Sequence, residues 1–124
     1  MSAPTAPCSR SRTARRDRVV TASWQHGRLG DPSEAPAQGE VTRFVARLAG
    51  TIVEEIHSGA LPEAVEYSSG VDEWVVVLAG SAHLVVDGEP VELTVGDWVL
   101  LPAETPHTLV RTEPGTHWLT VTGS

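Results

Sequence analysis

The chain has 124 residues, about the length of one domain, and its 40% hydrophobic and 20% charged residues are typical of a globular protein. No apolar run approaches the ~20 residues that a membrane-spanning helix requires, and the single cysteine, Cys8, excludes both an internal disulfide and a zinc site built from cysteines. All nine basic residues are arginine, which excludes mechanisms that depend on a Schiff-base lysine or a phosphate-loop lysine.

The net charge of −7 is unevenly distributed along the chain. Residues 1–18 carry five arginines and one aspartate, whereas the rest of the chain carries four arginines and fifteen carboxylates. Because an acidic body repels a phosphate backbone, we expect no nucleic-acid partner. No apolar stretch follows the arginines as it would in a secretory signal, and we expect a cytoplasmic protein without a membrane partner.

Residues 1–40 are expected to form a flexible, basic and proline-rich arm. They contain four prolines and several serines and glycines, and they show little apolar periodicity. Trp24 is the exception and could attach the arm to the body or to a partner. Residues 41–48 fit both a short helix and a strand, because their apolar residues recur at helical spacing in a segment that is short for a helix.

From residue 51 onward, short β-rich segments alternate with turn residues. Asp87-Gly88 is a strong hairpin signal, since this pair favours a tight turn between two strands. No segment is a helix long enough to connect parallel strands, so the pattern predicts an antiparallel sandwich or barrel over residues 41–124. The expected strands cover residues 51–57, 64–68, 73–78, 82–86, 90–95, 98–101, 107–112 and 117–121.

Two of these strands are apolar on both faces. Residues 75–78 and residues 99–101 contain no polar side chain. A strand with one face in water alternates apolar and polar residues, so both faces of these strands are expected to be covered. One face would line the core, and the other would contact the arm or a second copy of the chain. We expect a homodimer.

Two motifs share a joint spacing. Glu73 is followed after six residues by Gly80, and Gly96 is followed after five residues by Pro102, with His107 a further five positions along the chain. In this spacing the chain resembles the cupins, which are small jelly-roll barrels, and it is most similar to their small single-domain members. The resemblance implies an all-β fold, a single jelly-roll barrel behind the flexible N-terminal arm. Cupins commonly pair as homodimers, which agrees with the doubly apolar strands.

The resemblance also implies a divalent metal inside the barrel, but part of the ligand set is missing. In a typical cupin, a His-x-His pair, a glutamate and a later histidine bind the ion. The His-x-His positions fall here on Tyr67 and Ser69, or on Glu66 and Ser68 with the longer spacing. The second motif also departs from the family pattern, because Arg111 stands where an asparagine is usual.

Glu73 and His107 remain as candidate metal ligands. Two protein ligands are fewer than the three that usually surround an open catalytic position. His57 precedes a Ser-Gly turn and is the best candidate for a third ligand at the barrel mouth. The reduced set Glu73, His107 and His57 could hold iron, manganese, nickel or zinc.

The same residues could form a pocket without metal. Side-chain alternation places His107 and Arg111 on one face of their strand, and Glu73 shares a face with Val75. If these faces and Tyr67 point inward, buried charges meet there and must be paired or coordinated. A purely structural role is the other interpretation, with Glu73 held by Arg111 or Tyr67.

Two functions therefore remain open. The first is an enzyme acting on a small organic molecule inside the barrel, through a metal or through acid–base chemistry. The alternative is a non-catalytic binding or sensing module that has lost its metal, with Arg111 clamping a carboxylate. The expected catalytic residues are Glu73, His107 and Tyr67, and the expected substrate contacts are Arg111, Trp98 and Trp118.

Overall fold

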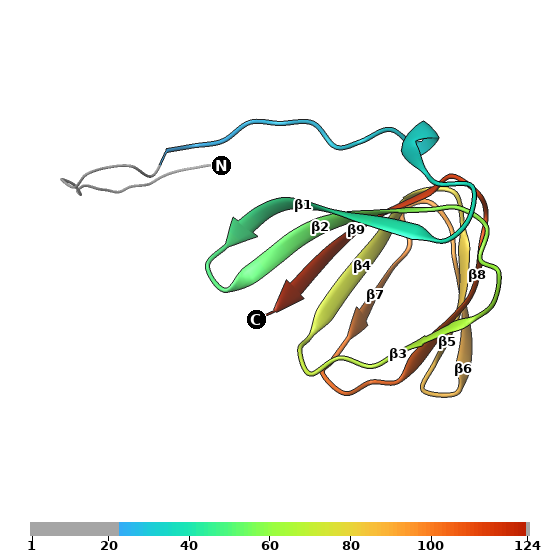
Figure 1. The fold of residues 1–124 in the computed structure, drawn as a ribbon. Coiled ribbons are helices and arrows are strands. Elements are labelled where there is room, and N and C mark those ends of the chain that lie inside the picture. Colours follow the sequence, from blue (N-terminus) through green and yellow to red (C-terminus); the bar gives the residue numbers. More distant parts are fainter. Residues whose placement is uncertain (1–22, 124) are drawn as a thin grey trace.

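The computed structural model describes residues 23–123. They form nine strands and a single turn of 3-10 helix, η1 (Pro32–Glu34), as Figure 1 shows. The all-β prediction is confirmed, and the predicted strands lie close to the observed ones. The strands are β1 (Glu40–Leu48), β2 (Thr51–Ser58), β3 (Val65–Tyr67), β4 (Glu73–Ala79), β5 (Ala82–Val86), β6 (Glu89–Leu93), β7 (Trp98–Leu101), β8 (His107–Thr112) and β9 (Thr116–Gly123).

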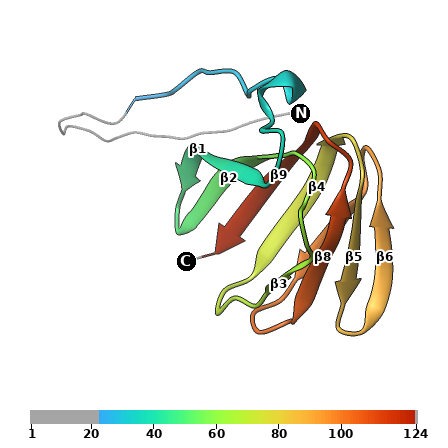
Figure 2. The same ribbon diagram turned by 45° about the vertical axis from the view of Figure 1, so that its right-hand side comes forward.

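The strands form two antiparallel sheets that face each other. One sheet has the order β1-β2-β9-β4-β7 and the other has the order β3-β8-β5-β6. Figure 2 shows the two layers meeting along one side and diverging toward the other. Neighbours in each sheet are often distant in sequence, as in the pairing of β2 with β9, which is the arrangement expected of a jelly roll.

Residues 41–48, which fit a helix or a strand by sequence, lie in β1. This strand pairs along its length with β2, from Glu40 opposite Ser58 to Leu48 opposite Thr51. The helical stripe is not used to bury side chains, since Leu48 is 59% exposed. Pairing with β2 satisfies the backbone groups on one side of this edge strand, and this outweighs the weak helical periodicity of the segment.

The predicted hairpin turn lies between β5 and β6. Asp87 and Gly88 both have positive φ, at 50° and 84°. These are the backbone angles that a two-residue type I′ turn requires, and they explain why an aspartate followed by a glycine stands at this position.

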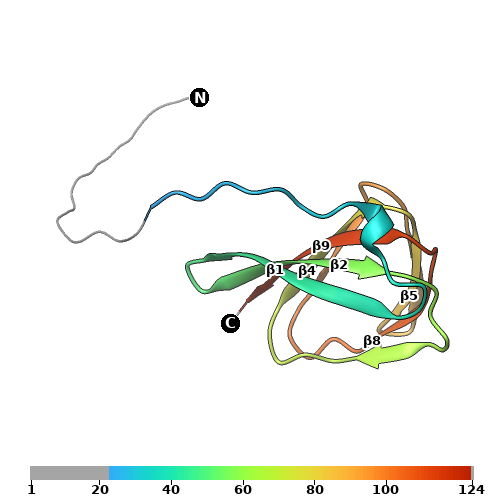
Figure 3. The same cartoon turned by 45° about the horizontal axis from the view of Figure 1, so that its top comes forward.

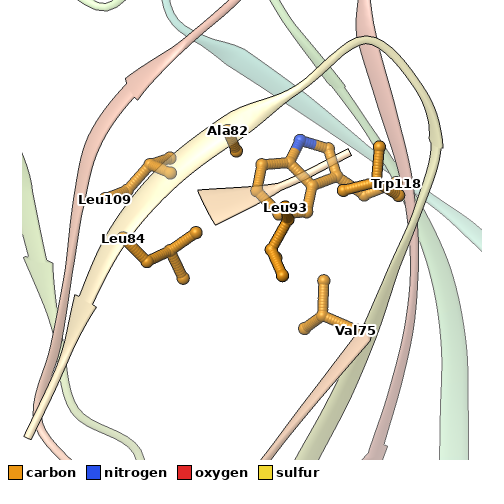
Figure 4. Packing of buried hydrophobic residues seen from close by; sticks show 7 residues of the cluster. Val75, Ala82, Leu84, Leu93, Leu109 and Trp118 are labelled. Carbon is orange, nitrogen blue, oxygen red and sulfur yellow. The ribbon is translucent and has the colours of Figure 1, made fainter. Parts of the chain in front are cut away.

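The core lies between the two sheets. Inward side chains from β4 and β9 pack against those from β5, β6 and β8, as Figure 4 shows. Val77 is completely buried, and it alternates with the outward-facing Val76 and Leu78. The core cluster consists of Val75, Val77, Ala82, Leu84, Leu93, Leu109 and Trp118.

A β-bulge interrupts the alternation of β8. Leu109 lies opposite Leu84, but Arg111 already lies opposite His83, so Val110 is an extra residue on β8. The bulge turns Arg111 to the outer face of the sheet, where its Nη2 lies 3.2 Å from Nε2 of His83. The expectation that Arg111 shares the inward face of His107 is therefore wrong.

The described part of the N-terminal arm runs along the outer face of the larger sheet (Figure 3). Helix η1 begins at an N-cap formed by Asp31, whose side chain accepts a hydrogen bond from the Ser33 amide. Trp24 is 86% exposed and does not attach the arm to the barrel. Residues 1–18, with their cluster of arginines, lie outside the described residues. In the described part of the chain, no helix is long and apolar enough to cross a membrane.

Candidate functional site

A pocket of about 160 Å³ opens between the two sheets. Its walls are mostly apolar, and its polar groups come from both sheets: Glu73 from β4, His107 from β8 and Tyr67 from β3. The lining residues are Glu40, Thr42, Ile56, Tyr67, Glu73, Val75, Leu84, Leu101, His107, Leu109 and Trp118. The residues of both motifs therefore reach one cavity.

Glu73 is the carboxylate at the edge of the apolar part of this pocket. Burial raises its pKa above 4.5, and the charge of Glu54 adds to this, while His107 partly opposes it. Among residues 23–123, no side chain or backbone group forms a hydrogen bond or an ion pair with the carboxylate. Burial thus favours the protonated form of Glu73, and the carboxyl group has no hydrogen-bond partner in the described part of the chain.

His107 lines the pocket, and a backbone contact determines which of its ring nitrogens carries the hydrogen. Its Nδ1 lies 3.1 Å from the carbonyl oxygen of Thr105, and a carbonyl can only accept a hydrogen bond. In its neutral form the ring therefore carries its hydrogen on Nδ1, and Nε2 keeps its lone pair. The ring stacks on Tyr67, with 5.6 Å between the ring centroids, and this contact fixes its orientation.

Tyr67 belongs to a hydrogen-bonded chain along the pocket wall. Its hydroxyl donates to Oε1 of Glu40 at 3.1 Å, and the Ser58 hydroxyl donates to Oε2 of the same carboxylate at 2.6 Å. Trp118 Nε1 in turn donates to the Ser58 hydroxyl at 2.9 Å. Burial and the charge of Glu40 raise the pKa of Tyr67 to about 12, so the phenol stays protonated and acts as a donor.

Three residues expected at the pocket lie elsewhere. Arg111 is on the outer face because of the bulge in β8. Trp98 is 58% exposed and packs against Trp74, with 6.1 Å between the rings, on the outer face of β4 and β7. His57 alternates with the pocket-lining Ile56 and therefore points to the opposite face of β2. Trp118 does line the pocket.

Glu40 is a pocket residue that the sequence analysis missed. It lies at the boundary between arm and barrel, where no motif marks it. The available signal was weak: Glu40 and Thr42 are two positions apart, so they share a face if the segment is a strand.

His57 belongs to a second group of polar residues on the outer face of the larger sheet. The Nε2 atoms of His57 and His117 lie 2.9 Å and 2.8 Å from Oε1 of Glu55. All three side chains are buried, and their ligand atoms lie within 4.8 Å of one another, so this outer cluster could hold a metal ion. The sequence signal was the alternation Glu55-x-His57 on one strand; the contribution of His117 depends on the pairing of β2 with β9.

The Glu55 carboxylate is ionised despite its burial. Burial alone would raise its pKa, but hydrogen bonds from the Gly30 amide, His117, Arg43 and His57 lower it to about 2. The Gly30 amide lies 2.9 Å from Oε1, and Arg43 Nη2 lies 3.1 Å from Oε2. Because Gly30 precedes the barrel, Glu55 also attaches the arm to the sheet.

The barrel pocket does not fit the metal that the family pattern implies. Of the expected ligands, only Glu73 and His107 face it, and Glu40 is engaged by Ser58 and Tyr67. Within residues 23–123, the outer cluster is the only set of three metal-binding side chains whose ligand atoms gather within 4.8 Å. The reduced ligand set of Glu73, His107 and His57 is therefore divided between two faces of the sheet.

The fold and the pocket together define a small single-domain jelly-roll barrel with a polar site between its sheets. The cupin domain family matches residues 52–122, and the chain belongs to this family. Among curated proteins, no match is found.

Solved structures from bacteria share the fold. A Ralstonia eutropha protein, provisionally named a mannose-6-phosphate isomerase, is 32% identical, with a TM-score of 0.66 over 79% of this chain and 99% of its own. A conserved Streptococcus pyogenes protein of unknown function is 21% identical, with a TM-score of 0.61 over 81% and 90% of the two chains. The cupin domain of an XRE family transcriptional regulator from Enterobacter cloacae is 22% identical, with a TM-score of 0.55 over 70% and 98%.

Proposed function

We propose that the barrel pocket binds a small uncharged organic molecule and that Glu73 and His107 exchange protons with it. The observation that carries this proposal is the pairing of two complementary groups in one pocket. Glu73 has a raised pKa and no partner among the described residues, and His107 Nε2 has a free lone pair. An acid and a base that face the same space are the arrangement required for general acid–base catalysis.

The size of the pocket limits the ligand. A buried cavity of about 150 Å³ is known to hold one benzene molecule, and this pocket has about 160 Å³. We therefore expect a reacting group of about six heavy atoms inside the barrel. A larger molecule would have to extend through the pocket opening into solvent.

The charges of the pocket favour an uncharged ligand. Two carboxyl groups, Glu40 and Glu73, line it, and none of the arginines within residues 23–123 does. A phosphate or carboxylate would lose its hydration there beside these two carboxyl groups without gaining a guanidinium partner. This argues against carrying a phosphosugar substrate over from the name of the Ralstonia protein, and it also removes the carboxylate clamp that was expected of Arg111.

The proposed chemistry is proton transfer next to a carbonyl group. His107 Nε2 takes a proton from the carbon beside the carbonyl, and the Glu73 carboxyl donates its proton to the carbonyl oxygen. The product is an enol, while His107 becomes positively charged and Glu73 negatively charged. Tyr67 keeps its proton and holds the His107 ring by stacking.

Cyclohexanone, an uncharged carbonyl compound of the expected size, is a suitable probe. Its exchange of carbon-bound hydrogen for deuterium in D2O can be followed by proton NMR with the wild-type protein and with Glu73→Gln and His107→Gln. We expect exchange above the buffer rate, reduced about 100-fold or more in both variants. His83→Gln, a change on the outer face, should leave the rate unchanged.

The outcomes separate the two candidate functions. Binding of cyclohexanone without exchange would support the non-catalytic binding module instead of the enzyme. If cyclohexanone shows neither binding nor exchange, the proposal is refuted. Benzoate should bind at least about tenfold more weakly than benzamide, which has the same size and shape but no charge; equal binding would contradict the charge argument.

We also propose that the chain forms a homodimer through the outer face of β4 and β7. Trp74, Val76, Trp98 and Leu100 come together on this face, and Leu100 is 57% exposed. The described part of the arm contacts the sheet at Glu55, on β2, and leaves this face open. Burial of such a face stabilises an association by roughly 25 cal/mol for each Å² of apolar area removed from water.

Light scattering tests the dimer. We expect twice the mass of one chain at micromolar concentration, and one chain mass for Leu100→Glu. Val95→Glu is the control, since Val95 is also exposed, at 64%, but lies outside β4 and β7. A wild-type protein with the mass of one chain would refute the proposal.

A further inference from the structure

The outer cluster of Glu55, His57 and His117 has a hydrogen-bond pattern that one oxygen cannot satisfy well. Oε1 of Glu55 lies 2.9 Å from His57 Nε2, 2.8 Å from His117 Nε2 and 2.9 Å from the Gly30 amide. A carboxylate oxygen has two lone pairs, so three donors are more than it can accept in good geometry. The other oxygen, Oε2, receives only Arg43 Nη2, at 3.1 Å.

A cation at this position would resolve the excess of donors. The two imidazoles would then act through the lone pairs of Nε2 instead of through N–H groups. Oε1 would give one lone pair to the cation and keep the other for the Gly30 amide. Within the part of the chain that the structure describes, His57 makes its only hydrogen bond through Nε2 and its buried Nδ1 makes none, so Nε2 is the nitrogen that faces the cluster.

Glu34 offers a fourth ligand beside the outer cluster. The position that a Cβ atom on Gly30 would occupy lies 2.8 Å from Glu34 Oε1 and 2.8 Å from His57 Nε2, so both atoms face the same small gap. Arg43 bridges the two carboxylates, with Nη1 3.1 Å from Glu34 and Nη2 3.1 Å from Glu55. Its side chain is 47% exposed and can swing into solvent when another cation enters.

We propose that Glu55, His57 and His117, with Glu34 as fourth ligand, bind one divalent transition-metal ion of the zinc class beneath the arm. Two imidazoles and two carboxylates match the ligands that Zn²⁺ takes in tetrahedral sites. With bonds of about 2.0–2.1 Å, ligand atoms in such a site are roughly 3.4 Å apart. The nitrogens must therefore move about half an ångström away from Oε1, and the imidazole rings, stacked at 4.3 Å, must tilt toward the ion.

The charge of the site allows this exchange. Glu34 and Glu55 carry two negative charges and Arg43 one positive charge, and a metal ion would bind the histidines in their neutral form. A divalent ion that displaces the guanidinium neutralises both carboxylates. The bound ion would connect the segment that contains Glu34 to β2 and β9, so its role is to attach the arm and not to act on the barrel ligand.

Calorimetric titration of the full-length, chelator-treated protein with Zn²⁺ tests the proposal. We expect one ion per chain for the wild type, and a loss of affinity of more than about 100-fold in His57→Gln and in His117→Gln. This bound is reasonable because removing a residue that only supports a ligand already costs about 10–100-fold. Far-ultraviolet circular dichroism should show that both variants keep their β structure.

Two control variants locate the ion. His107→Gln removes the histidine of the barrel pocket, and His83→Gln removes an exposed histidine beside Glu92. Both should bind zinc with the affinity of the wild type. If His107→Gln lost zinc binding and His57→Gln retained it, the ion would lie in the barrel and the proposal would be overturned. The absence of one bound ion per chain in the wild type would also overturn it.

X-ray absorption at the zinc edge of the wild-type protein provides a test that does not depend on a variant folding. We expect two imidazoles among four nitrogen and oxygen ligands at about 2.0–2.1 Å. A shell without two imidazoles would overturn the proposed ligand set.

Discussion

Replacing Glu55 with glutamine should destabilise the metal-free protein strongly, because one carboxylate accepts hydrogen bonds from four groups. The environment lowers the pKa of Glu55 from 4.5 to about 2. At 1.36 kcal/mol for each pKa unit, the folded protein favours the ionised carboxylate by roughly 3 kcal/mol. For a domain of about 100 residues, this corresponds to a fall in Tm of roughly 12 °C or more.

The same interaction predicts how the stability of the protein changes with pH. Since the folded pKa lies below the unfolded value, the contribution of Glu55 is complete above pH 4.5 and is lost as the pH falls toward 2. The free energy of unfolding, measured by urea titration in the presence of chelator, should fall over this range by roughly 3 kcal/mol more for the wild type than for Glu55→Gln. The two proteins should therefore become similar in stability near pH 2.

Glu54→Gln is the matched control for Glu55→Gln. It removes the same charge from the neighbouring position of β2, but the Glu54 side chain takes no part in the four hydrogen bonds. We expect its stability to stay within about 0.5 kcal/mol of the wild type at pH 7. If Glu55→Gln were as stable as Glu54→Gln, or if its stability kept the wild-type dependence on pH, the description of Glu55 as a buried ionised acceptor would be refuted.

Burial raises the pKa of Glu73, so the free energy of unfolding of the wild type should fall as the pH rises above 4.5. In urea titrations, Glu73→Gln should therefore be more stable than the wild type at pH 7 but not at pH 4. Gly80→Ala should lose about 2 kcal/mol or more, because φ is +84° and the new Cβ would lie 2.7 Å from Cα of Thr116; an unchanged Tm would contradict this. Arg111→Ala should not change the affinity for cyclohexanone, because Arg111 lies outside the pocket. A tenfold loss of affinity would show that Arg111 contacts the ligand. Deleting residues 1–18 should shift Tm by less than about 2 °C, because their composition cannot bury a core, and a larger loss would show that they dock on the barrel.

The sequence by itself determined the strands and the fold family. Turn residues decide where strands end: the Asp87-Gly88 pair occupies positive φ angles that few other residue pairs tolerate, and the strands on either side were predicted correctly. The spacing of Glu73 and His107 to their motif glycine and proline also identified two residues that line the pocket. These signals are local, so they can be read without knowing which strands are neighbours.

The tertiary structure decided which face each side chain occupies. Alternation predicted that Arg111 follows His107 into the barrel, but a single extra residue at Val110 reverses the face, and bulges leave no reliable signal in one sequence. His57 was assigned to the barrel mouth because it precedes a Ser-Gly turn, and the sequence does not tell which strand pairs with its own. Pairing of β2 with β9 places it beside His117.

The outer cluster could not have been predicted either, because it depends on which strands pair. Glu55 and His117 are separated by 62 positions along the chain, and they meet only because the register of β2 and β9 aligns their outward faces. The Gly30 amide completes the site through the path of the arm, which has no strand periodicity to predict it. Periodicity along a strand is fixed by the chain itself, whereas register, bulges and the course of a loop are fixed by contacts with the rest of the molecule.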